Sequence, residues 1–365
     1  MRRIVMIQQN HAVLRGSRTD AEDDPLRFVT MVGGCPRIDF HWKQDTNGKR
    51  RLIGNPNKPL RRLHRLFGQY LEEAISKMGK ENYELIKFPS STAFVRGTNP
   101  LKNAQKHQKG RFFYITDFAN AYPSVDLVRL AVLIVYIKRH NVYGLEMSLR
   151  MLGQNRVLVR ELQEDPLFLS ILAFLESYCS GQYGRGLAVG GPRSPYLFNL
   201  YCEVYADAGL RKVCERYGIT FTRYADDNVF SRDKPITSDI RRELRRRIES
   251  AGFQVNHRKS KVLCRDMGTV FVTKVGLRDQ NLVAPRSESA KAAIVFPKKK
   301  RRRLHGIIGS YLHMQMDWPE KVSGRIAEFL HYYRHVERRT AADHKTFALC
   351  KEFEREWAKY RKRRK

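Results

Sequence analysis

The sequence lacks several features that would assign it to common classes of protein. No apolar stretch approaches the roughly 18 residues of a membrane-spanning helix, and the first residues, MRRIVMIQQNHAVLRG, contain no apolar core long enough for a signal peptide. Its 6 cysteines form no CxxC pair, which argues against a zinc site and a disulfide framework. There is no internal repeat and no long low-complexity linker. These absences fit a protein of the reducing cytosol that has no membrane partner.

Acidic residues are also scarce relative to basic ones. Asp and Glu total 37 against 69 Lys and Arg, and the formal net charge of +32 is spread along the chain rather than confined to a tail. Because lysine and arginine gain free energy by displacing counterions from phosphates, a folded protein this basic is expected to bind a polyanion. A membrane surface is the rival polyanion, but no amphipathic basic helix stands alone, so nucleic acid is favoured. The 365 residues suffice for one large domain or two to three small ones.

The first third of the chain contains a predicted hairpin and a predicted helix. Strand-like residues from Ile38 onward precede a turn at Asn47-Gly48, and Leu52 and Ile53 follow it. The segment PLRRLHRLFGQYLEEAISKM then places its apolar residues on one helical face. The opposite face carries arginines, and a solvated face is the ordinary interpretation of each one: Arg61, Arg62 and Arg65.

The middle of the chain alternates short strands with helices. Residues 112–115 predict a buried strand that ends at Asp117, and SVDLVRLAVLIVYIKRH is apolar nearly all round, which predicts a buried helix. A glycine-rich turn then leads into a helix with Ser194 as N-cap, Pro195 at the first helical position and Gly218 at the end. The segment SDIRRELRRRIESAGF predicts another helix, and KVLC and TVFVTKVGL predict short strands.

Two aspartates stand side by side in FTRYADDNVFS, where the flanking residues predict two antiparallel strands with Asp226 and Asp227 at the turn. An Asp-Asp pair in a hairpin turn is usually turn chemistry alone. Asp117, however, also ends a buried strand, so the carboxylates converge if both strands lie in one sheet. Converging carboxylates are tolerated when hard divalent cations neutralise them. Two Mg²⁺ ions about 3.5–4 Å apart would clamp the attacking and leaving oxygens of a phosphoryl transfer.

The order of the motifs resembles one family. ITDFANAYPSVD, GGPRSPYLFNLY, YADD and AGFQVNHRKSKV are similar to the successive palm motifs of reverse transcriptases. KRRLIGNPNKPLRRLHRLFGQYLEEAI and SSTAFVRGTNPLKNAQKH are similar to the finger motifs of the bacterial retron-type branch, which includes abortive-infection and phage-defence enzymes. The resemblance covers about residues 38–290, and the basic helical remainder stands where the family has its thumb.

The resemblance implies an α+β, right-hand polymerase fold with fingers, an antiparallel-sheet palm and a helical thumb. Residues 1–110 would be an N-terminal segment and fingers, and residues 111–290 a palm with a helical fingers insertion over about 127–185. Residues 291–365 would be the basic thumb.

The palm motifs imply roles for individual residues. Asp117 and Asp226 would be metal ligands, with Asp227 beside them. Tyr122 would stack under the sugar and exclude a 2′-hydroxyl, with core packing as its alternative role. Lys259 in NHRKS matches the family lysine that protonates departing pyrophosphate.

The other site residues follow from the finger motifs, the glycine-rich turn and the basic run. Lys43 and Arg51 would hold the triphosphate, for which a bidentate arginine is suited. Gly190 and Gly191 would let the backbone approach the incoming base pair. KKKRRR, residues 298–303, has a nuclear localisation signal as its alternative interpretation. Contact with nucleic-acid phosphates is the better one in a chain this basic, and it applies to Arg301, Arg302 and Arg303.

One departure from the family pattern bears on substrate choice. The family commonly has Pro-Gln-Gly before the serine of this motif, and the glutamine usually contacts the nucleotide, whereas this chain has Ala188-Val189-Gly190. Template dependence therefore stays open.

The resemblance implies an RNA-directed DNA polymerase that uses two Mg²⁺ ions, with Mn²⁺ as the alternative metal. Its partners would be dNTPs, an RNA template in the form of a structured noncoding RNA, and the DNA product, in the bacterial cytoplasm and in antiphage defence. An accessory effector protein or a second copy of the chain is a further partner to consider. The alternatives are template-independent or protein-primed DNA synthesis, and a catalytically idle RNA-binding scaffold, against which the intact carboxylates argue.

Overall fold

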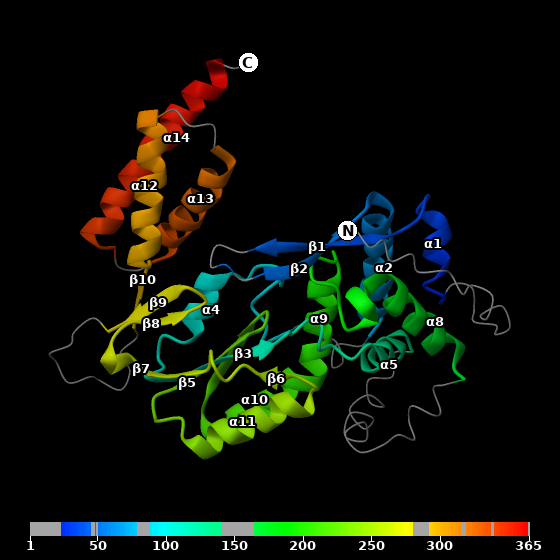
Figure 1. The fold of residues 1–365 in the computed structure, drawn as a ribbon. Coiled ribbons are helices and arrows are strands. Elements are labelled where there is room, and N and C mark those ends of the chain that lie inside the picture. The colour runs from blue at the N-terminus through cyan, green and yellow to red at the C-terminus, as the bar shows by residue number, and fades with distance from the viewer. Residues whose placement is uncertain are drawn as a thin grey trace.

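The computed structural model describes residues 23–44, 48, 50–78, 88–139, 164–279, 292–314, 319–336 and 339–363. These residues form helices and antiparallel sheets, which confirms the predicted α+β class. Figure 1 shows the C-terminal helices at one end of a central sheet and the N-terminal helices at the other. Of the predicted insertion over 127–185, residues 140–163 lie outside the described part, as does the predicted boundary near residue 290.

The central sheet has β3 in its middle. In the described part of the chain it contains five antiparallel strands in the order β4-β5-β3-β6, with β7 also paired to β3. The strands are β3 (Phe112–Ala119), β4 (Thr220–Tyr224), β5 (Asp227–Arg232), β6 (Gln254–Val255) and β7 (Lys261–Cys264). The predicted strand at 112–115 is confirmed, and it continues two residues past Asp117.

The two faces of this sheet belong to two different cores. Tyr114 and Phe230 are register partners and pack with the apolar residues of α10 (Ala208–Tyr217) and α11 (Ser238–Ser250). Phe113 and Val229 face the other core, which α4 (Pro100–Lys106) and the C-terminal helices share. Because side chains alternate along a strand, Asp117 lies on the same face as Phe113, away from α10 and α11.

The helix after the glycine-rich turn begins one residue earlier than the sequence predicts. Helix α9 (Ser194–Cys202) has Arg193 at its N-cap position, so the assignment of Ser194 as N-cap is wrong and the serine occupies the first helical position. A π-helical turn, Glu203–Asp207, joins α9 to α10. Gly218 ends α10 with φ +60°, as predicted, because glycine adopts this left-handed conformation without a steric penalty.

The N-terminal part contains the predicted hairpin and helix. Strands β1 (Ile38–Gln44) and β2 (Arg50–Pro56) pair along their whole length. Helix α2 (Lys58–Ser76) is capped by the Asn57 side chain and buries the predicted apolar stripe, while the predicted arginine face is exposed. It packs on the buried helix α5 (Leu127–Lys138), which confirms that prediction. The neighbouring helices are α1 (Arg27–Met31) and α8 (Pro166–Phe174), and the short helical turns are Leu175–Cys179, Gln182–Gly184 and Arg265–Met267.

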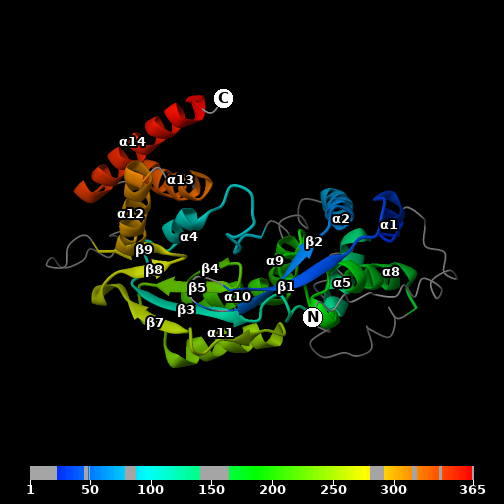
Figure 2. The same cartoon turned by 45° about the horizontal axis from the view of Figure 1, so that its top comes forward.

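The C-terminal part combines a small sheet with helices. Strands β8 (Val270–Val272), β9 (Val275–Arg278) and β10 (Ala293–Val295) form an antiparallel sheet, and β8 and β9 confirm the short strands predicted in TVFVTKVGL. Helices α12 (Lys298–Met314), α13 (Pro319–His335) and α14 (Ala341–Arg363) pack together and rise from this sheet, as Figure 2 shows from a second direction. Since β10 pairs with β9, the residues on either side of the predicted boundary share one sheet. No helix in the described ranges is long and apolar enough to cross a membrane.

Candidate active site

The two aspartates of the YADD motif lie in a tight turn beside β3. The acidic turn, residues 224–227, connects β4 to β5, and Tyr224 pairs with Asp227 across it. Asp117 is the register partner of Asp227, so the structure brings together the carboxylate-bearing residues that the sequence predicted to converge. Ala225 has φ +55°, a left-handed conformation that costs a non-glycine residue roughly 1–2 kcal/mol.

Lysine side chains balance part of the negative charge. Lys259 Nζ donates to Asp117 Oδ2, and this bond raises the pKa of the lysine. Desolvation by the surrounding protein, together with the carboxylates of Asp226 and Asp117, raises the pKa of Asp227 to about 6, while Lys259 and Lys274 oppose the shift. Lys274, in the β8–β9 turn, was not predicted from the sequence. The site is therefore a cluster of acids that already attracts cations.

The chemistry of these donors fits a hard divalent cation. The three carboxylates supply oxygen ligands, which Mg²⁺ prefers, and Asp117 Oδ1 is buried without a hydrogen-bond partner. As the side chains stand, no three His, Cys, Asp or Glu residues in the described part of the chain enclose an ion position. Metal binding by Asp117, Asp226 and Asp227 is therefore a proposal that rests on donor type, charge and the unpartnered oxygen.

Tyr122 stands beside the acidic turn. Its half-buried ring stacks on Phe198, with 4.9 Å between ring centroids. Burial and the nearby Asp226 carboxylate raise the pKa of the Tyr122 hydroxyl. This position fits both roles considered for the residue, contact with a sugar beside the carboxylates and packing on α9.

The predicted glycines serve a contact within the protein. Gly190 has φ +99°, and a Cβ there would clash with the carbonyl oxygen of Gly54 on β2. The Gly54 amide donates to the Val189 carbonyl at 2.7 Å, so the β1–β2 hairpin is docked on this loop. A Cβ on Gly191 would clash with Ser194 Oγ. Their contact with an incoming base pair stays a prediction.

Lys43 and Arg51 face each other across the β1–β2 hairpin. They are register partners and both are exposed. Two exposed cations opposite each other on a hairpin suit an anionic ligand. Their arrangement supports the proposal that this hairpin contacts a triphosphate.

The three predicted arginines of α12 do not have the same environment. Arg301 Nη2 donates to Asp343 Oδ1 of α14 at 2.6 Å, and its side chain is 18% exposed. Asp343 is fully buried and also accepts from the backbone and hydroxyl of Thr340. Arg302 and Arg303 are exposed. Arg301 is therefore committed to packing α12 on α14, and phosphate contact remains a proposal for Arg302 and Arg303.

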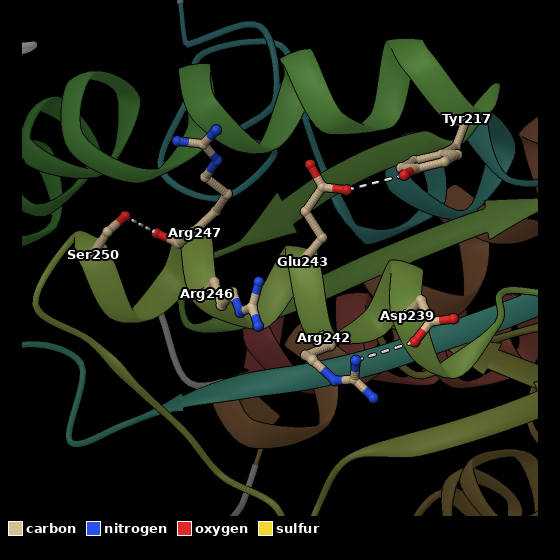
Figure 3. Close-up of a pocket in the computed structure, with 7 residues that line it drawn as sticks. All are labelled: Tyr217, Asp239, Arg242, Glu243, Arg246, Arg247 and Ser250. Carbon is tan, nitrogen blue, oxygen red and sulfur yellow. Dashed lines mark hydrogen bonds and ion pairs between the residues drawn. The ribbon is translucent and has the colours of Figure 1, made fainter.

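A surface hollow of about 460 Å³ lies on α10 and α11, away from the carboxylates. Its charged residues are of mixed sign, and both acids have partners: Asp239 pairs with Arg242, and Glu243 accepts from Tyr217 (Figure 3). This hollow has no converging donor set comparable to the acidic turn. The residues that line it are Tyr217, Asp239, Arg242, Glu243, Arg246, Arg247 and Ser250.

Three polar residues around the acidic turn were missed by sequence reasoning. Arg223, Asp207 and Asn199 are buried beneath the turn, and Arg223 donates hydrogen bonds to both of the others. The available signal was an arginine inside an apolar strand, directly before YADD. The sequence does not identify the partners of this arginine, because they come from the α9–α10 segment, which only the fold brings next to β4.

Comparison with known proteins gives matches over most of the chain. The model of the family "Reverse transcriptase (RNA-dependent DNA polymerase)" matches residues 42–307. The chain is 30% identical over 206 residues to the Retron Mx65 reverse transcriptase of Myxococcus xanthus. That alignment covers 56% of this chain and 43% of the relative, so the chain matches less than half the length of this curated relative.

Similar solved structures include two telomerases. Telomerase from Candida albicans in complex with a TWJ fragment of telomeric RNA is 14% identical with a TM-score of 0.42, over 89% of this chain and 60% of that one. Apo telomerase from Candida tropicalis is 12% identical with a TM-score of 0.40, over 67% and 46%. The family match spans far more than half of the chain and includes all three aspartates of the site. The chain belongs to the reverse transcriptase (RNA-dependent DNA polymerase) family.

Proposed function

We propose that this chain is an RNA-directed DNA polymerase, which joins deoxynucleotides to a primer 3′ end on an RNA template and releases pyrophosphate. One observation carries the proposal. Asp117 and Asp227 are register partners in adjacent strands, with Asp226 in the turn beside them, on the sheet face that α10 and α11 leave uncovered. Membership of the reverse transcriptase family supports the same activity.

The residues of the site would have different roles in the reaction. Asp117, Asp226 and Asp227 would hold two Mg²⁺ ions, with Mn²⁺ as the alternative. When bound, such ions supply Lewis acidity and charge neutralisation at the reacting oxygens. Lys259, whose pKa is raised by its bond to Asp117, would be protonated at neutral pH and would donate a proton to departing pyrophosphate. Tyr122 would contact the sugar, and Lys43 and Arg51 the triphosphate.

The proposed partners follow from the retron-type relative. The similarity to the retron reverse transcriptase of Myxococcus xanthus supports a retron-type enzyme. A structured noncoding RNA as template, a role in antiphage defence and a bacterial cytoplasmic location are our further proposals. We also propose the division into an N-terminal segment and fingers over 1–110, a palm over 111–290 with a fingers insertion over about 127–185, and a thumb over 291–365. An accessory protein or a second copy of the chain belongs to the same group of proposals.

Primer extension tests the function. The purified chain would receive Mg²⁺, dNTPs and a labelled DNA primer annealed to RNA, to DNA of the same sequence, or to no template. We expect templated extension on RNA, and a product that DNase degrades and RNase does not. Equal extension without template would favour template-independent synthesis, which the absent glutamine before Gly190 keeps open. No extension in any arm, with RNA binding retained, would favour the scaffold alternative.

A further inference from the structure

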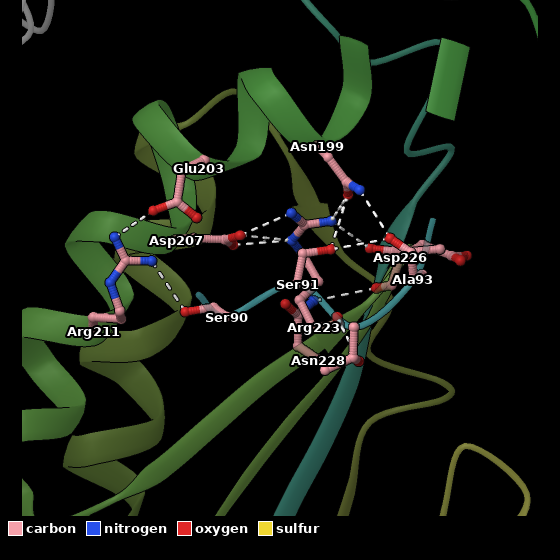
Figure 4. Close-up of polar contacts among 12 residues, drawn as sticks. Ser90, Ser91, Ala93, Asn199, Glu203, Asp207, Arg211, Arg223, Asp226 and Asn228 are labelled. Carbon is pink, nitrogen blue, oxygen red and sulfur yellow. Dashed lines mark hydrogen bonds and ion pairs between the residues drawn. The ribbon is translucent and has the colours of Figure 1, made fainter. Parts of the chain in front are cut away.

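An arginine with no exposed surface lies inside β4, directly before the acidic turn. Arg223 Nε donates to both carboxylate oxygens of Asp207, at 2.9 and 3.0 Å, and Nη2 donates to Asp207 Oδ2 at 2.8 Å. Its Nη1 donates to Asn199 Oδ1 and to the carbonyl oxygen of Ala225, each at 3.0 Å. Figure 4 shows these contacts converging on the guanidinium. The planar fork of arginine therefore joins the α9–α10 segment to the turn.

The turn that Arg223 contacts is strained and carries Asp226. Ala225 has φ +55°, a conformation that residues other than glycine rarely adopt without support. The next carbonyl, that of Asp226, accepts from the Phe118 amide at 3.0 Å and from Asn228 Nδ2 at 3.2 Å. Bonds to the carbonyls of both central residues thus fix the peptide planes on either side of the Asp226 α-carbon.

The same arginine also fixes the loop before α4. The Arg223 amide donates to the Ser90 carbonyl and the Thr92 amide donates to the Arg223 carbonyl, each at 2.8 Å. Asn199, which accepts from Arg223, donates to the Ala93 carbonyl at 2.9 Å. The turn, the α9–α10 segment and residues 90–93 therefore meet at one residue, through its side chain and its backbone.

Stability alone does not require this arrangement. Removing an arginine and an aspartate from water carries a large desolvation penalty, and well-packed apolar residues often replace such a pair without loss of stability. Asp207 and Arg223 are both fully buried, so the penalty applies to both. An apolar residue, however, could not donate to the Ala225 carbonyl.

We propose that Arg223 is a positioning residue for Asp226. Its bond to the Ala225 carbonyl keeps the turn in the left-handed conformation that presents the Asp226 carboxylate beside Asp117. Asp207 neutralises the guanidinium, and Asn199 orients it. The test of this role by primer extension rests on the proposed function.

A double-mutant cycle with Ala225→Gly tests this role, because glycine adopts a left-handed φ without support. Arg223→Lys keeps the charge for Asp207 but loses the planar fork. We expect it to lower the kcat of primer extension about a hundredfold, with the KM for dNTP and primer–template affinity little changed. In the Ala225→Gly background the same substitution should lower kcat by about tenfold or less. An equal loss in both backgrounds would show that Arg223 has only a structural role, and the inference would be wrong.

A substitute variant and a measurement independent of polymerisation complete the test. If Arg223→Lys does not fold, Asn199→Ala replaces it in the cycle, because this variant leaves the Arg223–Asp207 pair intact. It must then lower kcat more in the wild-type background than in the Ala225→Gly background. Hydrogen exchange at the Phe118 amide, which is bonded to the Asp226 carbonyl, reports on the turn without polymerisation. It should accelerate in Arg223→Lys, and unchanged exchange would contradict the proposal. Accelerated exchange with an inactive wild type would instead reject the proposed function and leave the positioning role standing.

Discussion

The central sheet and the C-terminal helices each contain an ion pair between an arginine and a fully buried aspartate. In the sheet, Arg223 of β4 meets Asp207 at 2.8 Å, and neither side chain is exposed. In the C-terminal helices, Arg301 of α12 meets Asp343 of α14 at 2.6 Å, and the aspartate is fully buried. Each pair joins two segments that lie apart in the sequence, so each fixes how those segments pack.

The charges beside the two pairs are opposite. Next to Arg223 stand the carboxylates of Asp226 and Asp227, whose mutual repulsion suits a cation. Next to Arg301 stand the exposed cations of Arg302 and Arg303, which suit phosphates. The difference teaches that neighbouring charged residues, such as Arg301, Arg302 and Arg303, need not share one role. One member can be used for packing while its neighbours remain available to a ligand.

Arg301→Ala removes the cation that pairs with the buried Asp343 in the C-terminal helices, and it should have the largest effect on stability. Asp343 would remain buried without its cation, and breaking such a pair costs about 3–5 kcal/mol. Chemical denaturation should show this loss, whereas Arg302→Ala should change the free energy of unfolding by less than about 0.5 kcal/mol. Equal effects of the two substitutions would remove the distinction drawn between these arginines.

Acid should destabilise the sheet region through His107, at the end of α4. Its Nδ1 lies 2.7 Å from Ser231 Oγ and its Nε2 lies 2.7 Å from Thr222 Oγ1. Burial lowers the pKa of His107 from 6.5 to about 3. As the pH falls below 6.5 the unfolded chain binds a proton that the folded chain does not, so stability decreases down to about pH 3.

At pH 5 this difference amounts to about 2 kcal/mol. His107→Gln cannot take up the proton, so its free energy of unfolding should fall less steeply between pH 6.5 and 4. Denaturant titrations at several pH values measure the slope. Part of the slope should remain, because burial also lowers the pKa of His64, to about 4. Identical slopes for the variant and the wild type would mean that His107 does not carry this dependence.

Tyr122→Ala should alter sugar selection beside the acidic turn. Loss of the ring opens space next to Asp226, and discrimination by one such contact is worth about 1–3 kcal/mol. We expect incorporation of ribonucleotides relative to deoxynucleotides to rise about tenfold in a competition assay. If only thermal stability falls and the ratio stays the same, the stacking on Phe198 is the whole role of the residue.

Arg302 and Arg303 should contribute to nucleic-acid binding rather than to stability. Each phosphate contact adds about −0.7 to −0.9 to the log–log salt slope, so replacing both residues by Ala should flatten the slope by up to about 1.4–1.8 units. The matched control is the double substitution of Arg242 and Arg246, exposed on α11 beyond the other face of the sheet. Parallel salt dependences for the wild type and the α12 double variant would place α12 outside the nucleic-acid path.

Local patterns predicted much of the fold and the acidic residues of the site. The alternation in residues 38–56, the stripe of α2 and the strands flanking Asp226 are short-range signals, and the structure confirms the elements that they predict. The predicted start of α9 was wrong by one residue, because Ser194 is the first residue of the helix and not its N-cap.

Contacts between distant residues could not be predicted in the same way. Arg301 looks like its neighbours in the sequence, and only the packing of α14 on α12 brings Asp343 to it. Position 190 must be glycine because a Cβ there would clash with Gly54, which lies on a hairpin more than a hundred residues earlier. The partners of Arg223 were unpredictable for the same reason, since α9 and α10 place them.

The central claim is that the carboxylates of the acidic turn carry nucleotide addition, and a matched pair of aspartate variants tests it most directly. Initial rates on one primed RNA template would be compared for the wild type, Asp226→Asn and the exposed Asp233→Asn. Removing a charged ligand worth several kcal/mol should lower the Asp226→Asn rate by at least about a thousandfold. Asp233→Asn should stay within about twofold, and both variants should unfold near the wild-type midpoint. A folded Asp226→Asn variant that adds nucleotides at the wild-type rate would contradict the account.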